Sequence, residues 1–278
     1  MRKFLQSFVL VTSLAARAAL ADPYKPNEVG VTMGHWHLNS RDVEANKKIF
    51  VALGGTAVKV GVFDIVRFPG VNVYLNLPPG SPAATDGTVG TVINHVGFVV
   101  PNVQEAVAKL KDLNVAIATG ANGINGRLDQ AFVTTPDGLK FELLEDKNQK
   151  VPIRSHHVHF HVAESAIPDM QAWYGKFFGA KPGMRGRYRV AEVPGATLTF
   201  TKSDIPTATT KGHVLDHIGF DVLDIAAALE KFEAAGIKPV TPAVKNPASG
   251  VWIAFIHDPW GTYIELNQRP NQTYLDQM

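Results

Sequence analysis

The stretch SHHVHFHV, residues 155–162, alternates between two kinds of side chain. Successive side chains of a β-strand point to opposite faces, so this stretch predicts a strand with His157, His159 and His161 on one face. The other, apolar face predicts packing on a core. Imidazole is the commonest metal ligand among protein side chains. Three imidazoles on one face therefore indicate a metal site or, alternatively, a solvated polar face that is rich in histidine.

The N-terminus has the pattern of a secretory signal. Arg2 and Lys3 precede a mostly apolar run over residues 4–16, and Ala19-Leu20-Ala21 is a small-residue cleavage site. The alternative is a hydrophobic first helix of the fold. We expect cleavage near Ala21 and an exported protein, periplasmic or secreted, and residues 1–21 are left out of the fold prediction.

Charge and composition exclude several classes of partner. The 278-residue chain has a formal net charge of +2, and loss of the three basic residues of the signal (Arg2, Lys3 and Arg17) lowers it to −1. We expect no nucleic acid, because there is no basic patch, and no membrane partner once the signal is removed. The chain has no cysteine, so a metal site would use His and carboxylate ligands.

The chain contains an internal repeat with an offset of about 122 residues. NHVGFVV at residues 94–100 matches DHIGFDV at residues 216–222, and FVTTPDGLKFELLE from Phe132 matches FIHDPWGTYIELNQ from Phe255. HWHL at residues 35–38 likewise matches HVHF at residues 157–160. The chain therefore divides into two similar halves.

Each half divides again into two similar units. A strand that contains His35, His95, His157 or His217 precedes a helix-like stretch, and about three strand-like runs follow. The unit of one strand, one helix and three strands thus occurs four times. The helices are expected at residues 42–53, 103–113, 168–178 and 225–235, with loops at residues 78–91, 147–154 and 203–212.

Four such βαβββ units, each opened by a histidine, resemble the vicinal oxygen chelate superfamily. It includes glyoxalase I, bleomycin and fosfomycin resistance proteins and the type I extradiol dioxygenases. The resemblance covers almost all of residues 30–268. It implies an α+β fold in which the four modules pair into two incomplete eight-stranded barrels, a first domain over residues 30–146 and a second over residues 155–268, with a metal in the cup.

Four modules in one chain look most like the extradiol dioxygenases, whose second pair of modules holds Fe(II) by two His and one Glu. Carried over to this chain, the ligands are His157, His217 and Glu265, the last in the run DPWGTYIE at residues 258–265. Such a triad leaves coordination positions open on non-haem Fe(II), where an oxygen-chelating substrate would bind a Lewis-acidic metal. Fe(II) is the favoured metal, and Mn(II), Zn(II) and Ni(II) are also compatible.

The first half repeats this triad as His35, His95 and Glu142. The extradiol enzymes usually hold no metal there. The repeated triad indicates either a second, weaker metal site or a polar cup lining that remains from the duplication.

The sequence departs from the ring-cleaving members at two positions. They place a Tyr on the strand before the D-P turn, where this chain has Phe255, and an acid–base His shortly before it, where residues 245–247 offer none. These departures oppose ring cleavage by the usual mechanism. The candidate proton-transfer residues are His159, His161 and His257, although His257 is alternatively a surface histidine.

Glyoxalase I adds a fourth ligand, a Glu from the last strand of the first module of a pair. The equivalent strands at residues 71–77 and 196–201 offer Tyr74 and Thr199 rather than a carboxylate. We therefore expect an open site with three protein ligands.

Three functions are compatible with these residues. The first is a metal-dependent enzyme, dioxygenase-like, that acts on a small oxygen-chelating substrate. The second is a lyase or isomerase of the glyoxalase type, and the third is a non-catalytic protein that binds a small ligand or a metal. The substrate and the oligomeric state stay open, because fold membership does not decide the reaction.

Overall fold

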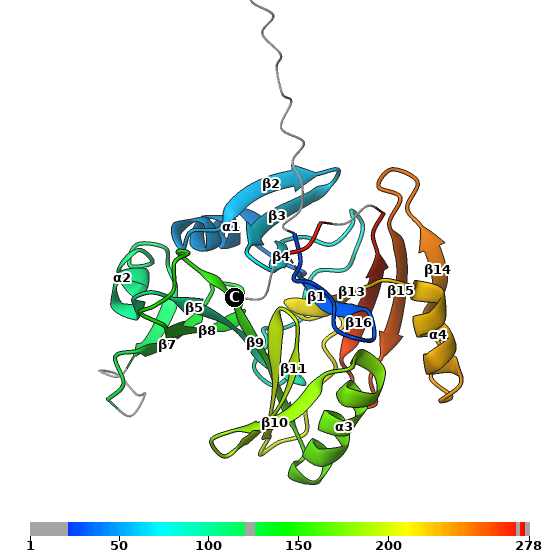
Figure 1. Ribbon diagram of the computed structural model, residues 1–278. Coiled ribbons are helices and arrows are strands. Elements are labelled where there is room, and N and C mark those ends of the chain that lie inside the picture. The colour runs from blue at the N-terminus through cyan, green and yellow to red at the C-terminus, as the bar shows by residue number, and fades with distance from the viewer. Residues whose placement is uncertain (1–21, 120–125, 271–272, 276–278) are drawn as a thin grey trace, which may run out of the picture.

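The computed structural model describes residues 22–119, 126–270 and 273–275 (Figure 1). The predicted signal at residues 1–21 lies outside the described residues. In the described part of the chain, one strand, one helix and three strands follow each other from β1, from β5, from β9 and from β13. The chain thus has an α+β fold with few helices and two open sheets.

The first sheet combines the two ends of the chain. It has eight strands in the spatial order β14 (Thr241–Lys245), β15 (Trp252–His257), β16 (Tyr263–Gln268), β13 (Leu215–Val222), β1 (Val31–Leu38), β4 (Val71–Tyr74), β3 (Phe63–Phe68) and β2 (Thr56–Val60). Strands β1 and β13 are antiparallel neighbours at its centre.

The second sheet is built from the middle of the chain. Its eight strands are, in spatial order, β10 (Lys181–Arg185), β11 (Tyr188–Val193), β12 (Ala196–Lys202), β9 (Arg154–Val162), β5 (Ile93–Val100), β8 (Lys140–Glu145), β7 (Gln130–Thr134) and β6 (Ala116–Thr119). Strands β5 and β9 are antiparallel neighbours at its centre. The strand predicted at residues 155–162 is thus β9.

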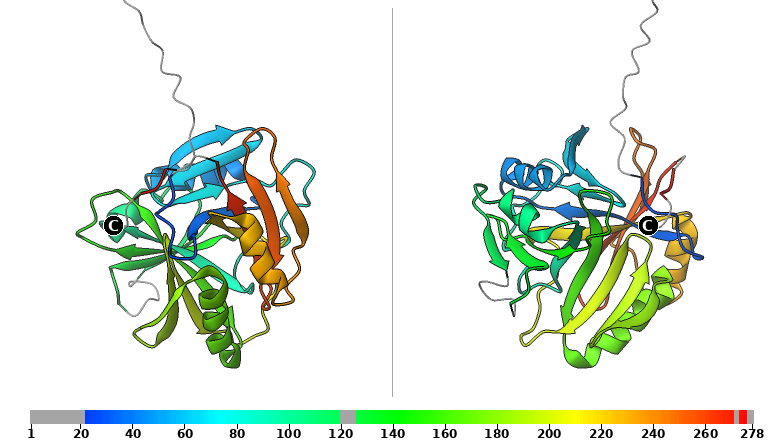
Figure 2. Two further views of the ribbon diagram at one scale, coloured as in Figure 1. Left: turned by 45° about the vertical axis from the view of Figure 1, so that its right-hand side comes forward. Right: turned by 60° about the vertical axis from the view of Figure 1, so that its left-hand side comes forward.

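The expectation that each half of the sequence builds its own barrel is wrong. The first module pairs with the fourth through β1 and β13, and the second module pairs with the third through β5 and β9. Figure 2 shows the red and orange C-terminal strands beside the blue and cyan N-terminal strands, with the green and yellow-green strands together elsewhere.

The path of the connections accounts for this pairing. A short connection over residues 146–153 takes the chain directly from β8 to β9 within the second sheet. The two long connections, residues 75–92 and 203–214, run side by side between the sheets. The amide of Val92 donates to the carbonyl of Ala208, and the amide of Val214 donates to the carbonyl of Asp86. The chain crosses to the second sheet along the first connection and returns along the other.

The apolar faces of the two sheets share one core. The rings of Trp36 on β1 and Phe98 on β5 lie 5.1 Å apart between centroids. The α-helices of the described residues contribute to this core: α1 (Val43–Ala52), α2 (Val103–Ala108), α3 (Ile167–Phe178) and α4 (Ile225–Glu233). On α3, Phe178 contacts Phe220 of the first sheet at 4.3 Å, so this helix joins the two sheets.

Three of the predicted helices begin at a capping side chain. The carboxylates of Asp42 and Asp224 accept a hydrogen bond from the third residue of their helices, and Asn102 does the same for α2. Helix α3 follows a 3₁₀ turn (Glu164–Ala166) and ends at Gly179 with a φ of 62°, a conformation that glycine adopts without strain. Among the described residues, none of the helices has the length and apolar character that crossing a bilayer requires.

We expect Phe50→Ala to lower the free energy of unfolding by about 3–5 kcal/mol. Phe50 on α1 is 1% exposed and contacts Phe68 of the first sheet and Phe98 and Phe141 of the second. The substitution therefore empties space that both sheets line. Urea denaturation measures the loss. Val51→Ala is the control, because Val51 is 44% exposed, and an equal loss in both variants would contradict this account of the core.

Candidate metal centres

Two clusters of His and Glu side chains lie on the two sheets, and each contains three imidazoles and one carboxylate. Cluster one, on the first sheet, consists of His35, His37, His217 and Glu265. Cluster two, on the second sheet, consists of His95, His157, His159 and Glu142. Within each cluster, one potential ligand atom of each residue lies within 4.8 Å of the others. Each cluster could therefore surround one ion.

All six residues of the two predicted triads lie in these clusters, but their predicted grouping is wrong. Cluster one contains His35 in place of His157, and cluster two contains His157 in place of His35. The exchange follows from the strand pairing, since β1 pairs with β13 and β9 pairs with β5. The two clusters also have the same donors, so the donor set gives no reason to call one of them weaker.

Glu265 lies at the centre of cluster one. Its Oε2 is 2.8 Å from Nε2 of His217 and 3.2 Å from Nε2 of His35, and its Oε1 accepts a hydrogen bond from Asn267 at 2.9 Å. Burial would raise the pKa of Glu265, but His35 and His217 hold it well below its ordinary value. The carboxylate is therefore ionised, as metal binding requires.

Glu142 has the corresponding place in cluster two. Its Oε2 is 3.1 Å from Nε2 of His157 and 3.4 Å from Nε2 of His95. Gln130 donates a hydrogen bond to its Oε1. Burial would raise the pKa of Glu142, but the two imidazoles hold it below its ordinary value. An amide side chain thus orients the carboxylate in both clusters.

A glycine makes room for one imidazole in each cluster. Gly219 pairs with His35 across β13 and β1, and Gly97 pairs with His157 across β5 and β9. A Cβ atom on Gly219 would lie 1.9 Å from Cε1 of His35, and one on Gly97 would lie 2.0 Å from Cε1 of His157. Any other residue would displace the imidazole, which explains the repeated H-x-G pattern of β5 and β13.

Unpaired ring nitrogens in both clusters fit a metal ion. Nδ1 of His37 and Nε2 of His95 and His157 are buried and have no hydrogen-bond partner among the described residues. The last two lie near Glu142 without hydrogen-bond geometry. A buried polar atom without a partner is costly, and a metal ion would satisfy it. Imidazole and carboxylate suit Fe(II), Mn(II), Zn(II) and Ni(II).

The clusters differ in the groups behind His217 and His95. Oδ1 of Asp216 lies 2.7 Å from Nδ1 of His217, whereas the amide oxygen of Asn94 lies 2.9 Å from Nδ1 of His95. Burial opposes the charged form of His217, but Asp216 and Glu265 outweigh it and raise the pKa of His217 to about 9. Burial lowers the pKa of His95 to about 4. A carboxylate behind a histidine makes it a more basic ligand.

His37 and His159 supply a fourth candidate donor to their clusters. Nε2 of His37 lies 2.9 Å from the carbonyl oxygen of Asn76, and Nε2 of His159 lies 3.0 Å from Oγ1 of Thr201. Burial is the main cause that lowers the pKa of both imidazoles well below the ordinary value. Both rings are therefore neutral near pH 7 and can bind a metal without losing a proton.

The expectation of three protein ligands is therefore replaced by four candidate donors. The residues beside His35 and His157 in the parallel neighbouring strands are Asn72 and Thr197, not the predicted Tyr74 and Thr199. Neither residue is a carboxylate. The fourth donor instead comes from the H-x-H pattern, because residues i and i+2 of a strand share a face.

His161 and His257 lie beside the clusters rather than in them. The ring of His161 is 5.3 Å from that of His159, and burial lowers the pKa of His161. The ring of His257 stacks on Tyr263 at 4.9 Å, and Tyr263 in turn contacts His217 at 5.7 Å. These two histidines line the cups at a second layer from the candidate ligands.

Cluster one has aromatic walls. Tyr74 lies 5.1 Å from His35, and Phe255 lies 5.3 Å from His217 between ring centroids. Phe63 contacts His37 at 5.6 Å. Cluster two has fewer aromatic neighbours, chiefly Phe132 at 5.2 Å from His95. Phe255 thus gives cluster one an apolar wall next to His217.

Residues 154–266 match the sequence model of the Glyoxalase/Bleomycin resistance protein/Dioxygenase superfamily. This part of the chain is therefore similar to that superfamily. Its match is continuous in sequence, although β9 to β12 lie in the second sheet and β13 to β16 lie in the first. No curated protein matches the sequence.

Solved structures share this fold over most of the chain. A point mutant of glyoxalase I from Zea mays is 19% identical, with a TM-score of 0.67 over 86% of this chain and 92% of that one. The glyoxalase I from Zea mays itself is 18% identical, with a TM-score of 0.65 over 86% and 92%. A candidate dioxygenase from Bacillus subtilis is 15% identical, with a TM-score of 0.63 over 91% and 87%. These likenesses concern the fold.

Sequence reasoning missed His37 as a ligand and Asp216, Asn94, Asn267 and Gln130 as supporting groups. The signal for His37 was the repeated H-x-H pattern, because His37 has the same place in the first copy as His159 has in the second. The polar residue directly before His95 and His217 was a second signal. Asn267 follows Glu265 by two residues and so shares its strand face, which was a third signal. Gln130 left no local signal, because only the pairing of folded strands brings it to Glu142.

We expect the protein to bind two divalent ions per chain. Glu265→Gln and Gly219→Ala each remove only the ion of cluster one, and Glu142→Gln and Gly97→Ala remove only that of cluster two. Elemental analysis after removal of loose metal measures this. Gly183→Ala is the control, because its Cβ would meet Val190 at 3.6 Å, an ordinary contact. A single ion that is lost with either Glu variant would contradict two separate sites.

In the metal-free protein, we expect the free energy of unfolding to fall as pH rises from 6.5 to about 9. The pKa of His217 is raised from 6.5 to about 9. Protonated His217 therefore stabilises the fold fully below pH 6.5, and this contribution is lost as pH rises through 9. Urea titrations at several pH values measure the slope. Asp216→Asn should flatten it, whereas Asp224→Asn at the start of α4 should not.

Proposed function

We propose that this chain is a divalent-metal-dependent enzyme that binds a small, oxygen-chelating substrate at cluster one. The observation that supports this most directly is the set of buried, converging donors of His35, His37, His217 and Glu265, in which Nδ1 of His37 lacks a protein partner among the described residues. A bound divalent metal would act there as a Lewis acid and as a template for the substrate oxygens. His35, His37, His217 and Glu265 would hold this metal.

The residues behind the donors hold them in place. Asp216 fixes the ring orientation of His217, and Asn267 fixes the carboxylate of Glu265. Gly219 allows the ring of His35 to lie against β13. Ligands that are oriented by a second layer of hydrogen bonds bind metal in a defined geometry.

The aromatic walls favour a planar substrate. Phe255 and Tyr263 stack on each other at 4.8 Å beside His217, and Tyr74 lies beside His35 and His37. Burial raises the pKa of Tyr74 and of Tyr263 to about 12. Both phenols therefore keep their protons near neutral pH and can donate a hydrogen bond to a substrate oxygen.

Dioxygenase chemistry with Fe(II) is the reaction that we place first. Tyr263 and Tyr74 provide phenols near the cluster, although Phe255 stands where ring-cleaving relatives have Tyr. A lyase or isomerase of the glyoxalase type is the second candidate, and Phe255 is the observation that favours it, since such a reaction needs no phenol at that position.

The test compares the protein loaded separately with Fe(II), Mn(II), Zn(II) and Ni(II). We expect oxygen uptake with a catechol-type substrate in the Fe(II) form. The rate should fall to background in Glu265→Gln, and by about 10–100-fold in Asp216→Asn, which alters only the group behind a ligand. Glu142→Gln is the matched control and should keep the activity.

Other outcomes contradict the proposal in distinct ways. Activity lost in Glu142→Gln but kept in Glu265→Gln would move catalysis to cluster two. Turnover of a 2-oxoaldehyde thiol adduct without oxygen uptake would establish the lyase or isomerase reaction. Tight metal binding with no turnover in any metal form would leave a protein that binds ligand or metal only.

A further inference from the structure

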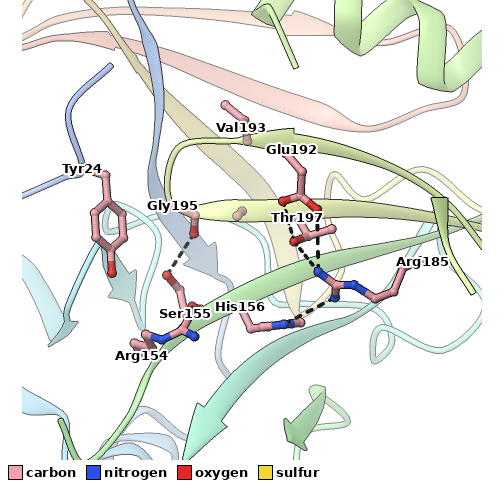
Figure 3. A pocket seen from close by; sticks show the side chains of 10 residues that line it. Tyr24, Arg154, Ser155, His156, Arg185, Glu192, Val193, Gly195 and Thr197 are labelled. Atoms are coloured by element: carbon pink, nitrogen blue, oxygen red, sulfur yellow. Dashed lines mark hydrogen bonds and ion pairs between the residues drawn. The ribbon is translucent and has the colours of Figure 1, made fainter. Parts of the chain in front are cut away.

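A polar pocket lies next to cluster two. It has a volume of about 250 Å³ and is formed by the start of β9, the end of β10 and the turn between β11 and β12. Figure 3 shows Arg185 reaching across it towards His156, with Arg154 and Tyr24 on the other side. His156 is the immediate neighbour of the candidate ligand His157, so the pocket opens directly behind the cluster.

We propose that this pocket binds a small organic carboxylate through Arg185 and Arg154. In this proposal, His156 couples carboxylate binding in the pocket to metal binding at cluster two. The coupling rests on the metal-binding function proposed above, whereas the pocket itself does not.

The pocket offers guanidinium donors that are only loosely engaged. Arg185 donates to Oγ1 of Thr197 at 3.0 Å, and its ion pair with Glu192 is long, at 3.6 Å. Arg154 reaches Asp146 only at 4.0 Å. The Arg185 side chain is 46% exposed and that of Arg154 is 26% exposed, so both are accessible to a ligand.

The charge balance favours a monoanion. Two guanidinium groups and the carboxylate of Glu192 line the pocket, so the lining has an excess of one positive charge. The planar fork of an arginine matches the two oxygens of a carboxylate. A small organic carboxylate fits both the charge and the shape of these donors.

In the first sheet, side chains of the described residues fill the place that corresponds to this pocket. The residue that corresponds to His156 is Gly34, where a Cβ would lie 2.6 Å from Oδ1 of Asp221. That space is taken by the ion pair of Asp221 with Arg269, whose Nε lies 3.0 Å from Oδ2. The pocket is therefore a property of cluster two and not of the repeat.

His156 links the pocket to the cluster through its two ring nitrogens. Its Nδ1 lies 2.8 Å from Nδ1 of His157, and its Nε2 lies 3.4 Å from Nη1 of Arg185. One proton must lie between the two Nδ1 atoms, because an acceptor cannot bond to an acceptor. A neutral imidazole carries a single ring proton, which in His156 lies on either Nδ1 or Nε2.

The position of that proton depends on the state of His157. Without metal, Nε2 of His157 can carry the proton and face Glu142 at 3.1 Å. Nδ1 of His157 then accepts from His156, and Nε2 of His156 accepts from Arg185. In this state, one N–H of Arg185 is used inside the protein.

Metal on Nε2 of His157 reverses this order. The remaining proton of His157 then lies on its Nδ1 and is donated to Nδ1 of His156. The proton of His156 therefore moves to its Nε2, where it faces the N–H of Arg185. The N–H of His156 and the N–H of Arg185 then face each other and cannot bond to each other. Both can therefore donate to a carboxylate in the pocket. Metal therefore favours the carboxylate and, because linkage is reciprocal, the carboxylate favours metal.

The experiment follows the arginine side-chain NMR signals of the full chain during titration with acetate, first metal-free and then loaded with Zn(II). We expect saturable binding in both forms, tighter with Zn(II). Arg185→Gln and Arg154→Gln should each weaken acetate binding about tenfold or more, since a hydrogen bond to a charged group is lost. Arg187→Gln is the control, because its guanidinium donates to the hydroxyl of Tyr188 and lies on the adjacent turn.

His156→Gln tests the coupling. We expect it to retain acetate binding and the Zn(II) content but to lose the effect of Zn(II) on acetate affinity, and a retained effect would overturn the role of His156. Equal acetate binding in Arg185→Gln, Arg154→Gln and Arg187→Gln would overturn the pocket. Tighter binding of inorganic phosphate than of acetate would overturn the carboxylate class. A protein that binds no Zn(II) would refute the proposed function, and the metal-free titration would still decide the pocket.

Discussion

Both candidate metal centres depend on the antiparallel pairing of two histidine-bearing strands from different modules. The register of β1 against β13 places His35 opposite Gly219 and His37 opposite His217. The register of β9 against β5 repeats this with Gly97 and His157. A slip by one residue would turn every imidazole into the apolar core. The pairing of glycine with histidine therefore decides whether the donors can converge at all.

The shared core holds these registers in place. Apolar side chains on the reverse faces of the same strands pack between the sheets, as Trp36 and Phe98 do. Since Trp36 lies between His35 and His37 in sequence, the residue that orients the core also orients the ligands. Each cluster is thus built on rigid strands rather than on loops, which is the arrangement that keeps ligand geometry precise.

The duplication produced two centres with the same donors and different surroundings. Cluster one has Asp216 behind a histidine and aromatic walls. Cluster two has Asn94 in the matching place and a cationic pocket behind His157. The differences lie one layer away from the donors, where substitution changes basicity and substrate choice without removing the ligand set.

The sequence by itself determined the strands, the repeat and the donor types, because period-two alternation and the H-x-G and P-x-G patterns are local. His35, His95, Glu142, His157, His217 and Glu265 could all be found in this way. Only the tertiary structure decided which of them meet. Modules that resemble one another can pair in several combinations, and the choice depends on the path of residues 75–92 and 203–214 and on core contacts between distant residues. Such contacts leave no trace in the spacing of His157 and His217, which lie in different sheets because their strands bury their apolar faces against one shared core.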